Sequence, residues 1–154
     1  MEAHQLLADA GMAPRLLYCG LLDGECDVRN AGSFTQVSPG GLYACPVDMV
    51  VMEYIEGDTV DKASVLPKDI REKAEKAIQK LHDAQLVFGD LRAVNVMVSG
   101  DKVFLIDFDW AGKVNEARYP LYLSRSLKWP KEAEELEMEY ILMDHDRFIY
   151  FPSN

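Results

Sequence analysis

Two short runs of β-branched and other apolar residues, separated by a Ser-Gly-Asp turn, constrain the fold of this chain most strongly. The first run covers Val96 to Val98 and the second covers Val103 to Ile106, with Ser99-Gly100-Asp101 between them. Such runs favour strands, and a short turn that contains Gly and Asp joins neighbouring strands into an antiparallel hairpin. We therefore predict a β-hairpin in the second half of the chain.

Polar residues flank the place where the open end of this hairpin would lie. Asp90 and Asn95 belong to a polar loop from Gly89 to Asn95 before the first strand, and Asp107 follows the second strand. Each residue alone would be typical of a turn or a cap. Together they offer carboxylate and amide oxygens, and Mg²⁺ takes oxygen ligands and usually only one or two protein carboxylates. The ordered set therefore predicts a site for magnesium and phosphate chemistry.

The pattern D-L-R-x-x-N-V-M-V followed by L-I-D-F resembles the catalytic loop and the metal-binding segment of the protein kinase-like superfamily. The resemblance implies that Asp90 is the catalytic aspartate, which orients an acceptor hydroxyl. It implies that Asn95 and Asp107 hold Mg²⁺ on the phosphates of ATP. Arg92 falls where many kinases place a lysine near the transferred phosphate. The expected activity is ATP- and Mg²⁺-dependent phosphoryl transfer to a hydroxyl of a protein substrate.

Helical periodicity predicts the main helices of the chain. A short helix is expected from Glu2 to Ala10, with Gly11 as its stop, and an acidic helix from Lys131 to about Asp144. The clearest pattern predicts a helix from Pro67 to Gln85. The apolar residues that repeat at helical spacing in it are Ile70, Ala74, Ala77, Ile78 and Leu81.

A continuous apolar strand is predicted from Val47 to Ile55, and another strand is predicted between Ala13 and Gly20. The first resembles the strand and hinge that join the two kinase lobes, where backbone groups bind the adenine edge. Without that resemblance, its residues would be typical of an ordinary core strand. The nucleotide contacts that the resemblance implies are Met52, Glu53, Ile55 and Met97.

The expected architecture is α+β with a protein-kinase-like fold. A chain of 154 residues suits one domain, and we divide it into a small-lobe remnant with the hinge strand (1–55) and a mostly helical large lobe that carries the hairpin (56–154). The motifs together resemble the fungal-type branch of kinase-like domains. The Gly-rich loop and the strand lysine of that family would precede Met1. The expectation is therefore a domain that lacks the N-terminal part of the small lobe, with weakened catalysis.

Charge and cysteine content exclude several classes of function. The formal net charge of −10 disfavours nucleic acid or an anionic membrane as a partner. No apolar run approaches a membrane span, and the N-terminus is too polar for a signal peptide. The three cysteines lack metal-site spacing and are odd in number, so reduced thiols are expected. These features indicate an intracellular protein of the cytoplasm or nucleus.

Three alternatives stay open on the sequence. The chain could be a pseudokinase or fragment that acts by binding a protein partner, which would cover the incomplete small lobe. It could be a small-molecule kinase of the aminoglycoside-phosphotransferase type, because the A-P-E that usually closes a protein-kinase activation segment is absent. It could also be an incomplete gene product whose natural form contains the missing strands.

Overall fold

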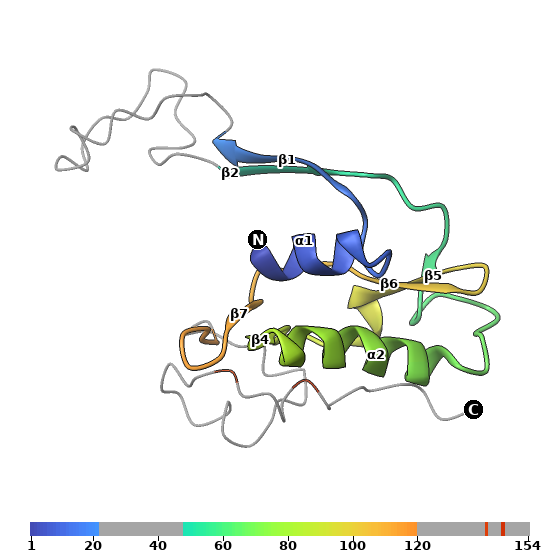
Figure 1. The fold of residues 1–154 in the computed structure, drawn as a ribbon. Coiled ribbons are helices and arrows are strands. Elements are labelled where there is room, and N and C mark those ends of the chain that lie inside the picture. The colour runs from blue at the N-terminus through green and yellow to red at the C-terminus, as the bar shows by residue number, and fades with distance from the viewer. Residues whose placement is uncertain (22–47, 120–140, 142–145, 147–154) are drawn as a thin grey trace, which may run out of the picture. The chain divides into compact units, whose positions relative to one another are not determined.

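The computed structural model describes residues 1–21, 48–119, 141 and 146 (Figure 1). The acidic helix expected from Lys131 to about Asp144 lies outside the described residues, apart from Ile141. Across the described ranges, no helix combines the length and the apolar character needed to cross a membrane.

The chain divides into two compact units, and each is described by itself. One unit comprises Met1–Arg15 together with Tyr54–Asn154, and the other comprises Leu16–Glu53. The first unit contains the hairpin, the helices and the polar loop that the sequence singles out.

The unit Leu16–Glu53 contains an antiparallel pair of strands, β1 (Leu16–Leu21) and β2 (Asp48–Met52). Both strands were expected, but β2 is shorter than the predicted strand and ends at Met52. The register explains this difference, because Leu16, the first residue of β1, lies opposite Met52. No residue of β1 remains to pair with the chain beyond Met52, so the strand ends there.

The two described α-helices belong to the other unit, which also contains a short 3-10 helix, η2 (Ala93–Asn95). Helix α1 (Glu2–Asp9) ends as expected near Gly11, whose φ of +70° suits glycine and whose N–H donates to the Ala8 carbonyl over 2.9 Å. Helix α2 (Ile70–Asp83) is shorter at both ends than predicted. Its buried residues are the five that the periodicity indicated, Ile70, Ala74, Ala77, Ile78 and Leu81.

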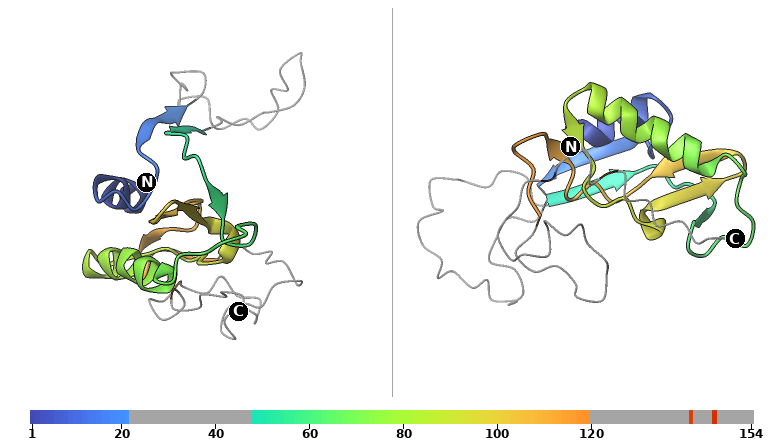
Figure 2. Two further views of the ribbon diagram at one scale, coloured as in Figure 1. Left: turned by 90° about the vertical axis from the view of Figure 1, so that its right-hand side faces the viewer. Right: turned by 90° about the horizontal axis from the view of Figure 1, so that it is seen from below.

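Short antiparallel strands complete this unit. Strands β3 (Asp58–Thr59), β5 (Val96–Ser99) and β6 (Lys102–Leu105) form one sheet in that order, β3-β5-β6. Strands β4 (Leu86–Val87) and β7 (Gly112–Lys113) form a separate pair. Figure 2 shows α2 running beside the β5–β6 hairpin, and α2 contacts β4, β6 and α1.

The predicted hairpin is confirmed. Strands β5 and β6 pair from Val96 opposite Leu105 to Ser99 opposite Lys102, and Gly100 in the turn has a φ of +58°. At the other end, the Leu105 N–H donates to the Met12 carbonyl over 2.9 Å, which attaches the hairpin to the segment after α1. The described fold is therefore mixed α+β with small antiparallel sheets, consistent with a fragment of a kinase-like fold.

Candidate functional site

The loop between β4 and β5 is arranged around the backbone carbonyl of Asp90. The Arg92 N–H donates to this carbonyl over 2.9 Å, and the side-chain Nδ2 of Asn95 donates to it over 3.1 Å. Asp90 and Asn95 are only 5% and 4% exposed. Because Nδ2 of Asn95 is committed to the loop, and an amide nitrogen does not coordinate cations, Oδ1 is the atom of this side chain that can act as a metal ligand.

The carboxylate of Asp90 forms a two-pronged ion pair with Arg92. Nε of Arg92 donates to Oδ1, and a terminal guanidinium nitrogen donates to Oδ2. This hydrogen-bonded pairing is the main reason why the pKa of Arg92 is raised above its ordinary value. A guanidinium and a carboxylate joined through two parallel hydrogen bonds have a well-defined mutual orientation.

Asp107 follows β6 and lies at the open end of the hairpin. The N–H of Ile106 donates to the carbonyl of Asn95 over 3.0 Å, which places the residue before Asp107 opposite Asn95. Asp107 is exposed and has a φ of +64°, in the left-handed region that non-glycine residues rarely occupy. The hairpin thus brings Asn95 and Asp107, twelve positions apart in the sequence, to the same end.

Electrostatic interactions connect Asp107 with the polar loop. Partial desolvation of its carboxyl raises the pKa of Asp107, the neighbouring charge of Asp109 raises it further, and the charge of Asp90 adds to this effect. The positive charge of Arg92 acts in the opposite direction. The carboxylates of Asp109 and Asp90 thus both disfavour a negative charge on Asp107, and a divalent cation at this carboxylate would relieve that repulsion.

The donor set fits magnesium bound together with phosphate better than it fits a protein-only metal site. In the part of the chain that the structure describes, no group of three or more His, Cys, Asp and Glu residues could hold a metal ion. One carboxylate from Asp107 and one amide oxygen from Asn95 suit Mg²⁺, which is commonly bound through one or two carboxylates and completed by substrate phosphates and water.

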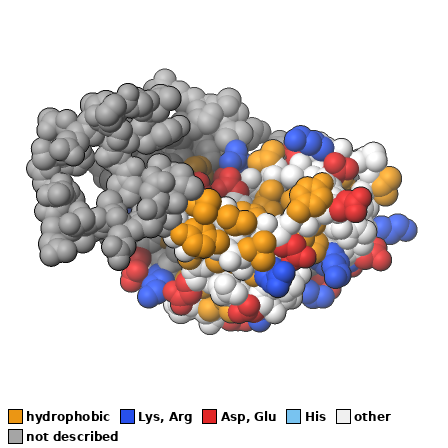
Figure 3. Space-filling view, turned by 90° about the horizontal axis from the view of Figure 1, so that it is seen from above, with side chains coloured by type: hydrophobic (Ala, Val, Ile, Leu, Met, Phe, Trp, Pro, Cys, Tyr) orange, Lys and Arg blue, Asp and Glu red, His pale blue; other side chains and the backbone are white. Residues whose placement is uncertain are grey.

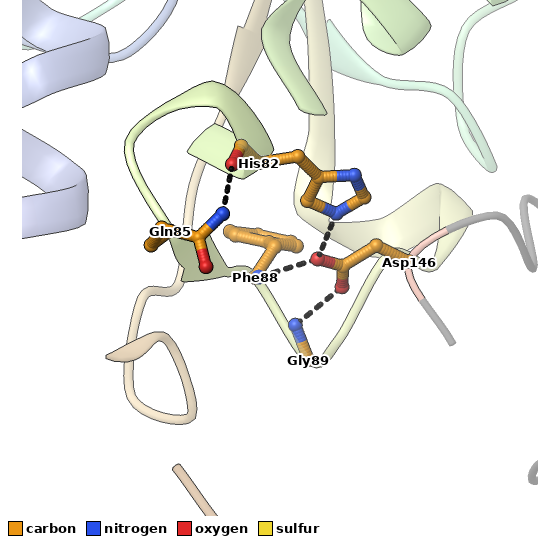
Figure 4. Close-up of polar contacts among 5 residues, drawn as sticks. All are labelled: His82, Gln85, Phe88, Gly89 and Asp146. Atoms are coloured by element: carbon orange, nitrogen blue, oxygen red, sulfur yellow. Dashed lines mark hydrogen bonds and ion pairs between the residues drawn. The ribbon is translucent and has the colours of Figure 1, made fainter. Parts of the chain in front are cut away.

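Asp146 anchors this loop, and sequence reasoning missed it. Its fully buried carboxylate accepts hydrogen bonds from the backbone N–H groups of Phe88, over 2.7 Å, and Gly89, over 2.6 Å. Nε2 of His82 lies 3.1 Å from the same carboxylate (Figure 4). No motif marks Asp146 in the sequence, since its partners lie more than fifty residues earlier in the chain.

Gly89 is required by the geometry of the same turn. Its φ is +84°, and a Cβ at this position would lie 2.8 Å from Cδ1 of Ile141 and 3.2 Å from the carbonyl oxygen of Trp110. The left-handed backbone conformation strains any residue with a side chain here, and the crowding would require its neighbours to shift. The N–H that Gly89 directs to Asp146 therefore depends on glycine immediately before Asp90.

A group of aromatic rings supports the residue after Asp107. The ring of Phe108 packs edge-on against Phe88, with centroids 5.2 Å apart and an interplanar angle of 83°. The imidazole ring of His4, which belongs to α1, stacks on the ring of Phe108. Because Phe88 precedes Gly89 in the loop, these rings join the two segments that carry Asp90 and Asp107. Sequence reasoning missed His4, which carries no recognisable motif.

The residues predicted to contact a nucleotide fall in both compact units. Met52 and Glu53 are exposed and belong to Leu16–Glu53, whereas Ile55 and Met97 are partly buried and belong to the other unit. Met97 lies on β5 opposite Phe104. A common role for these four residues in adenine binding stays a prediction.

Comparison with known proteins gives one family match and several relatives. The model of the RIO domain matches residues 41–129, more than half of the chain. A probable bifunctional tRNA threonylcarbamoyladenosine biosynthesis protein of Methanospirillum hungatei is 36% identical over 93 residues, which cover 60% of this chain and 17% of that protein. The probable serine/threonine-protein kinase mkcF of Dictyostelium discoideum is 30% identical over 124 residues, which cover 75% of this chain and 16% of that protein.

A third relative is the KEOPS complex subunit Bud32 of Pyrococcus abyssi. It is 40% identical over 68 residues, which cover 41% of this chain and 31% of that protein. The chain therefore spans less than a third of the length of each of these three relatives.

Proposed function

This chain belongs to the RIO-domain family within the protein kinase-like superfamily, and from that premise we propose that it carries an ATP- and Mg²⁺-dependent phosphotransferase site. The site comprises Asp90, Arg92, Asn95 and Asp107. We also propose the narrower placement in the fungal-type branch, which rests on the sequence motifs alone.

Each side chain has a distinct role in the proposed reaction. Asp90 orients the acceptor hydroxyl toward the terminal phosphate, and Arg92 contacts the transferred group with its guanidinium. Asn95 and Asp107 supply oxygen ligands to Mg²⁺, which neutralises phosphate charge when it is bound. Orientation by Asp90 can suffice, because the loose transition state of phosphoryl transfer requires little proton removal early in the reaction.

One observation supports the proposal most directly. The β5–β6 hairpin and the bond from Ile106 N–H to the Asn95 carbonyl bring the amide and the carboxylate of the predicted ligand pair to one end. Asp107 occupies a left-handed backbone conformation there and has a raised pKa. Strained and electrostatically unfavourable placement of a carboxylate is more typical of a functional site than of a stabilising contact.

Calorimetric titration with Mg-ATP tests this proposal. We expect the wild-type chain to bind Mg-ATP and Asp107→Asn to bind at least about tenfold more weakly, because a metal-ligand charge is lost. Asp101→Asn is the matched control, since Asp101 is exposed at the turn end of the same hairpin. Equal Mg-ATP affinity in all three proteins would contradict the assignment of Asp107.

Turnover of isotope-labelled ATP tests catalysis separately from binding. Transfer of label by the wild-type chain above the background of Asp107→Ala would support catalysis, and equal rates would exclude it for this chain. For the acceptor, we propose a protein hydroxyl in line with the relative named as a serine/threonine-protein kinase. Label in a small-molecule fraction instead of protein would favour the aminoglycoside-phosphotransferase type.

A second candidate function is binding of a protein partner, and it rests on exposed apolar residues. Figure 3 shows hydrophobic side chains gathered on the molecular surface. Among the described strands, β1 and β2 pair only with each other, and two strands alone make a marginally stable sheet. The large hydrophobic side chains of β1 and β2 with an exposed fraction of 39% or more are Leu17, Tyr18, Val50, Val51 and Met52.

Light scattering after size-exclusion chromatography distinguishes the two candidates. A chain that needs a partner to cover β1 and β2 should self-associate or aggregate when it is isolated. A monodisperse monomer that binds Mg-ATP would favour the phosphotransferase site. Self-association without Mg-ATP binding would favour the partner-binding role.

A further inference from the structure

We propose that the ion pair between Arg92 and Asp90 acts as a latch. It keeps the Asp90 carboxylate from the acceptor until a phosphate group binds the guanidinium of Arg92 in its place. The inference rests on the proposed function, because it assigns a form of regulation to the same loop. It concerns the order of events at the site: Asp90 becomes available to an acceptor only after a phosphate group has arrived.

The closed latch is the ion pair seen in the structure. Both oxygens of the Asp90 carboxylate accept hydrogen bonds from Arg92, one from Nε and one from a terminal nitrogen. An acceptor hydroxyl needs a carboxylate oxygen to receive its hydrogen bond. With both oxygens engaged in the plane of the guanidinium, a hydroxyl must compete with a charge-assisted, two-pronged contact, which is stronger than a hydrogen bond to a neutral donor.

The difference in exposure between the two partners supports this order. The Arg92 side chain is 33% exposed, whereas the Asp90 side chain is 6% exposed. A ligand that arrives from solvent therefore meets the guanidinium more readily than the carboxylate. The Arg92 N–H donates to the Asp90 carbonyl independently of the side-chain ion pair, so the latch can open by movement of the Arg92 side chain alone.

A phosphate group has the chemistry needed to compete for Arg92. Guanidinium groups bind phosphate and carboxylate through the same two-pronged geometry, and a terminal phosphate carries more negative charge than a single carboxylate. The negative charge of Asp107 also acts on Arg92 and contributes to its raised pKa. Transfer of the guanidinium to phosphate frees both oxygens of Asp90 for the acceptor hydroxyl.

Nitrogen-15 NMR of arginine side chains tests the latch directly. The Nε–H resonance of Arg92 is assigned from its absence in Arg92→Lys and is followed with inorganic phosphate, with Mg-ADP and with a non-hydrolysable Mg-ATP analogue. Sodium chloride at equal ionic strength is the blank. We expect a saturable shift with inorganic phosphate and with the ATP analogue, and a smaller shift or none with ADP.

Calorimetry on the same samples separates the latch from the proposed function. If the ATP analogue binds and the Arg92 resonance does not move, the latch is wrong and the nucleotide site stands. If no nucleotide binds but inorganic phosphate moves the resonance, the latch stands and the nucleotide site is wrong. If neither occurs, both are wrong.

Three variants provide a second readout. Arg92→Gln should bind the ATP analogue about tenfold more weakly, because one charge-assisted contact is lost. Arg92→Lys keeps the charge but cannot engage two oxygens with a planar group, so its affinity should stay within about threefold of wild type. Arg71→Gln, which removes an exposed positive charge from α2, should leave the affinity unchanged. Wild-type affinity in Arg92→Gln would contradict a phosphate contact by Arg92.

Discussion

The imidazole ring of His4 lies parallel to the phenyl ring of Phe108, with centroids 4.5 Å apart and an interplanar angle of 5°. His4 is 2% exposed, and its Nε2 lies 2.8 Å from the Pro14 carbonyl oxygen. Because a carbonyl only accepts hydrogen bonds, Nε2 carries the proton and donates. The ring thus joins α1, the segment after α1 and the residue next to Asp107.

Replacement of His4 should destabilise the fold through two separable contributions, a hydrogen bond and ring packing. His4→Phe keeps a stacking ring but leaves the Pro14 carbonyl without this donor, at a cost of about 1 kcal/mol. His4→Ala also removes buried ring contacts and should cost about 3 kcal/mol. Urea unfolding measures both values, with Gln5→Ala on the same helix as an exposed control. Equal stability of His4→Ala and Gln5→Ala would contradict a structural role for the stack.

Asp146→Asn should loosen the turn before Asp90. An asparagine has one acceptor oxygen, so its NH₂ group would face a backbone N–H that the carboxylate now accepts. We expect a loss of about 2–4 kcal/mol in the free energy of unfolding. Hydrogen exchange at the Phe88 and Gly89 amides should become faster. Asp83→Asn, an exposed change on α2, should alter neither quantity, and unchanged exchange in Asp146→Asn would contradict the anchoring role.

Asp107→Asn should stabilise the fold although it weakens Mg-ATP binding. The pKa of Asp107 is raised in the folded state, so its charged form is less favourable there than in the unfolded chain. The gain in the free energy of unfolding should be largest near neutral pH and should vanish as the pH falls toward 3.8, the ordinary value. Because Asp107 is an exposed residue whose carboxyl is only partly desolvated, we expect a gain below about 1 kcal/mol.

Thermal unfolding of Asp107→Asn and wild type across this pH range provides the measurement. Asparagine tolerates the left-handed backbone conformation of residue 107, so the comparison isolates the charge. A lower melting temperature for Asp107→Asn at neutral pH would show that Asp107 is a stabilising residue and would remove one argument for its function.

Gly57→Ala should destabilise the chain more than Gly11→Ala. A Cβ on Gly57 would lie 2.1 Å from the carbonyl oxygen of Val98, which belongs to the backbone of β5 and cannot rotate away. We expect a cost of about 3 kcal/mol. Gly11 meets no atom within 4 Å but has a φ of +70°, so Gly11→Ala should cost about 1 kcal/mol. Urea unfolding of both variants checks this order, and a reversed order would contradict the close approach at Gly57.

The sequence alone was sufficient for the local elements of the fold. The β5–β6 hairpin followed from two apolar runs around Gly100, and the buried face of α2 followed from helical spacing. Apolar residues repeat about every 2 residues in a half-buried strand and about every 3.6 residues in an amphipathic helix. This repeat marks the buried face of a single element, so it can be recognised without knowing which segment packs against that face. The extent of β2 was not readable, because the register with Leu16 decides where that strand ends.

Only the tertiary structure decided how the candidate site is supported. The contacts of Asp146 with Phe88 and Gly89 and the stacking of His4 on Phe108 leave no periodic trace in the sequence. A residue's type limits which contacts it can make, but the packing of distant segments selects the partner. The residues for chemistry were therefore visible in the motif, whereas the residues that position them emerged from the fold.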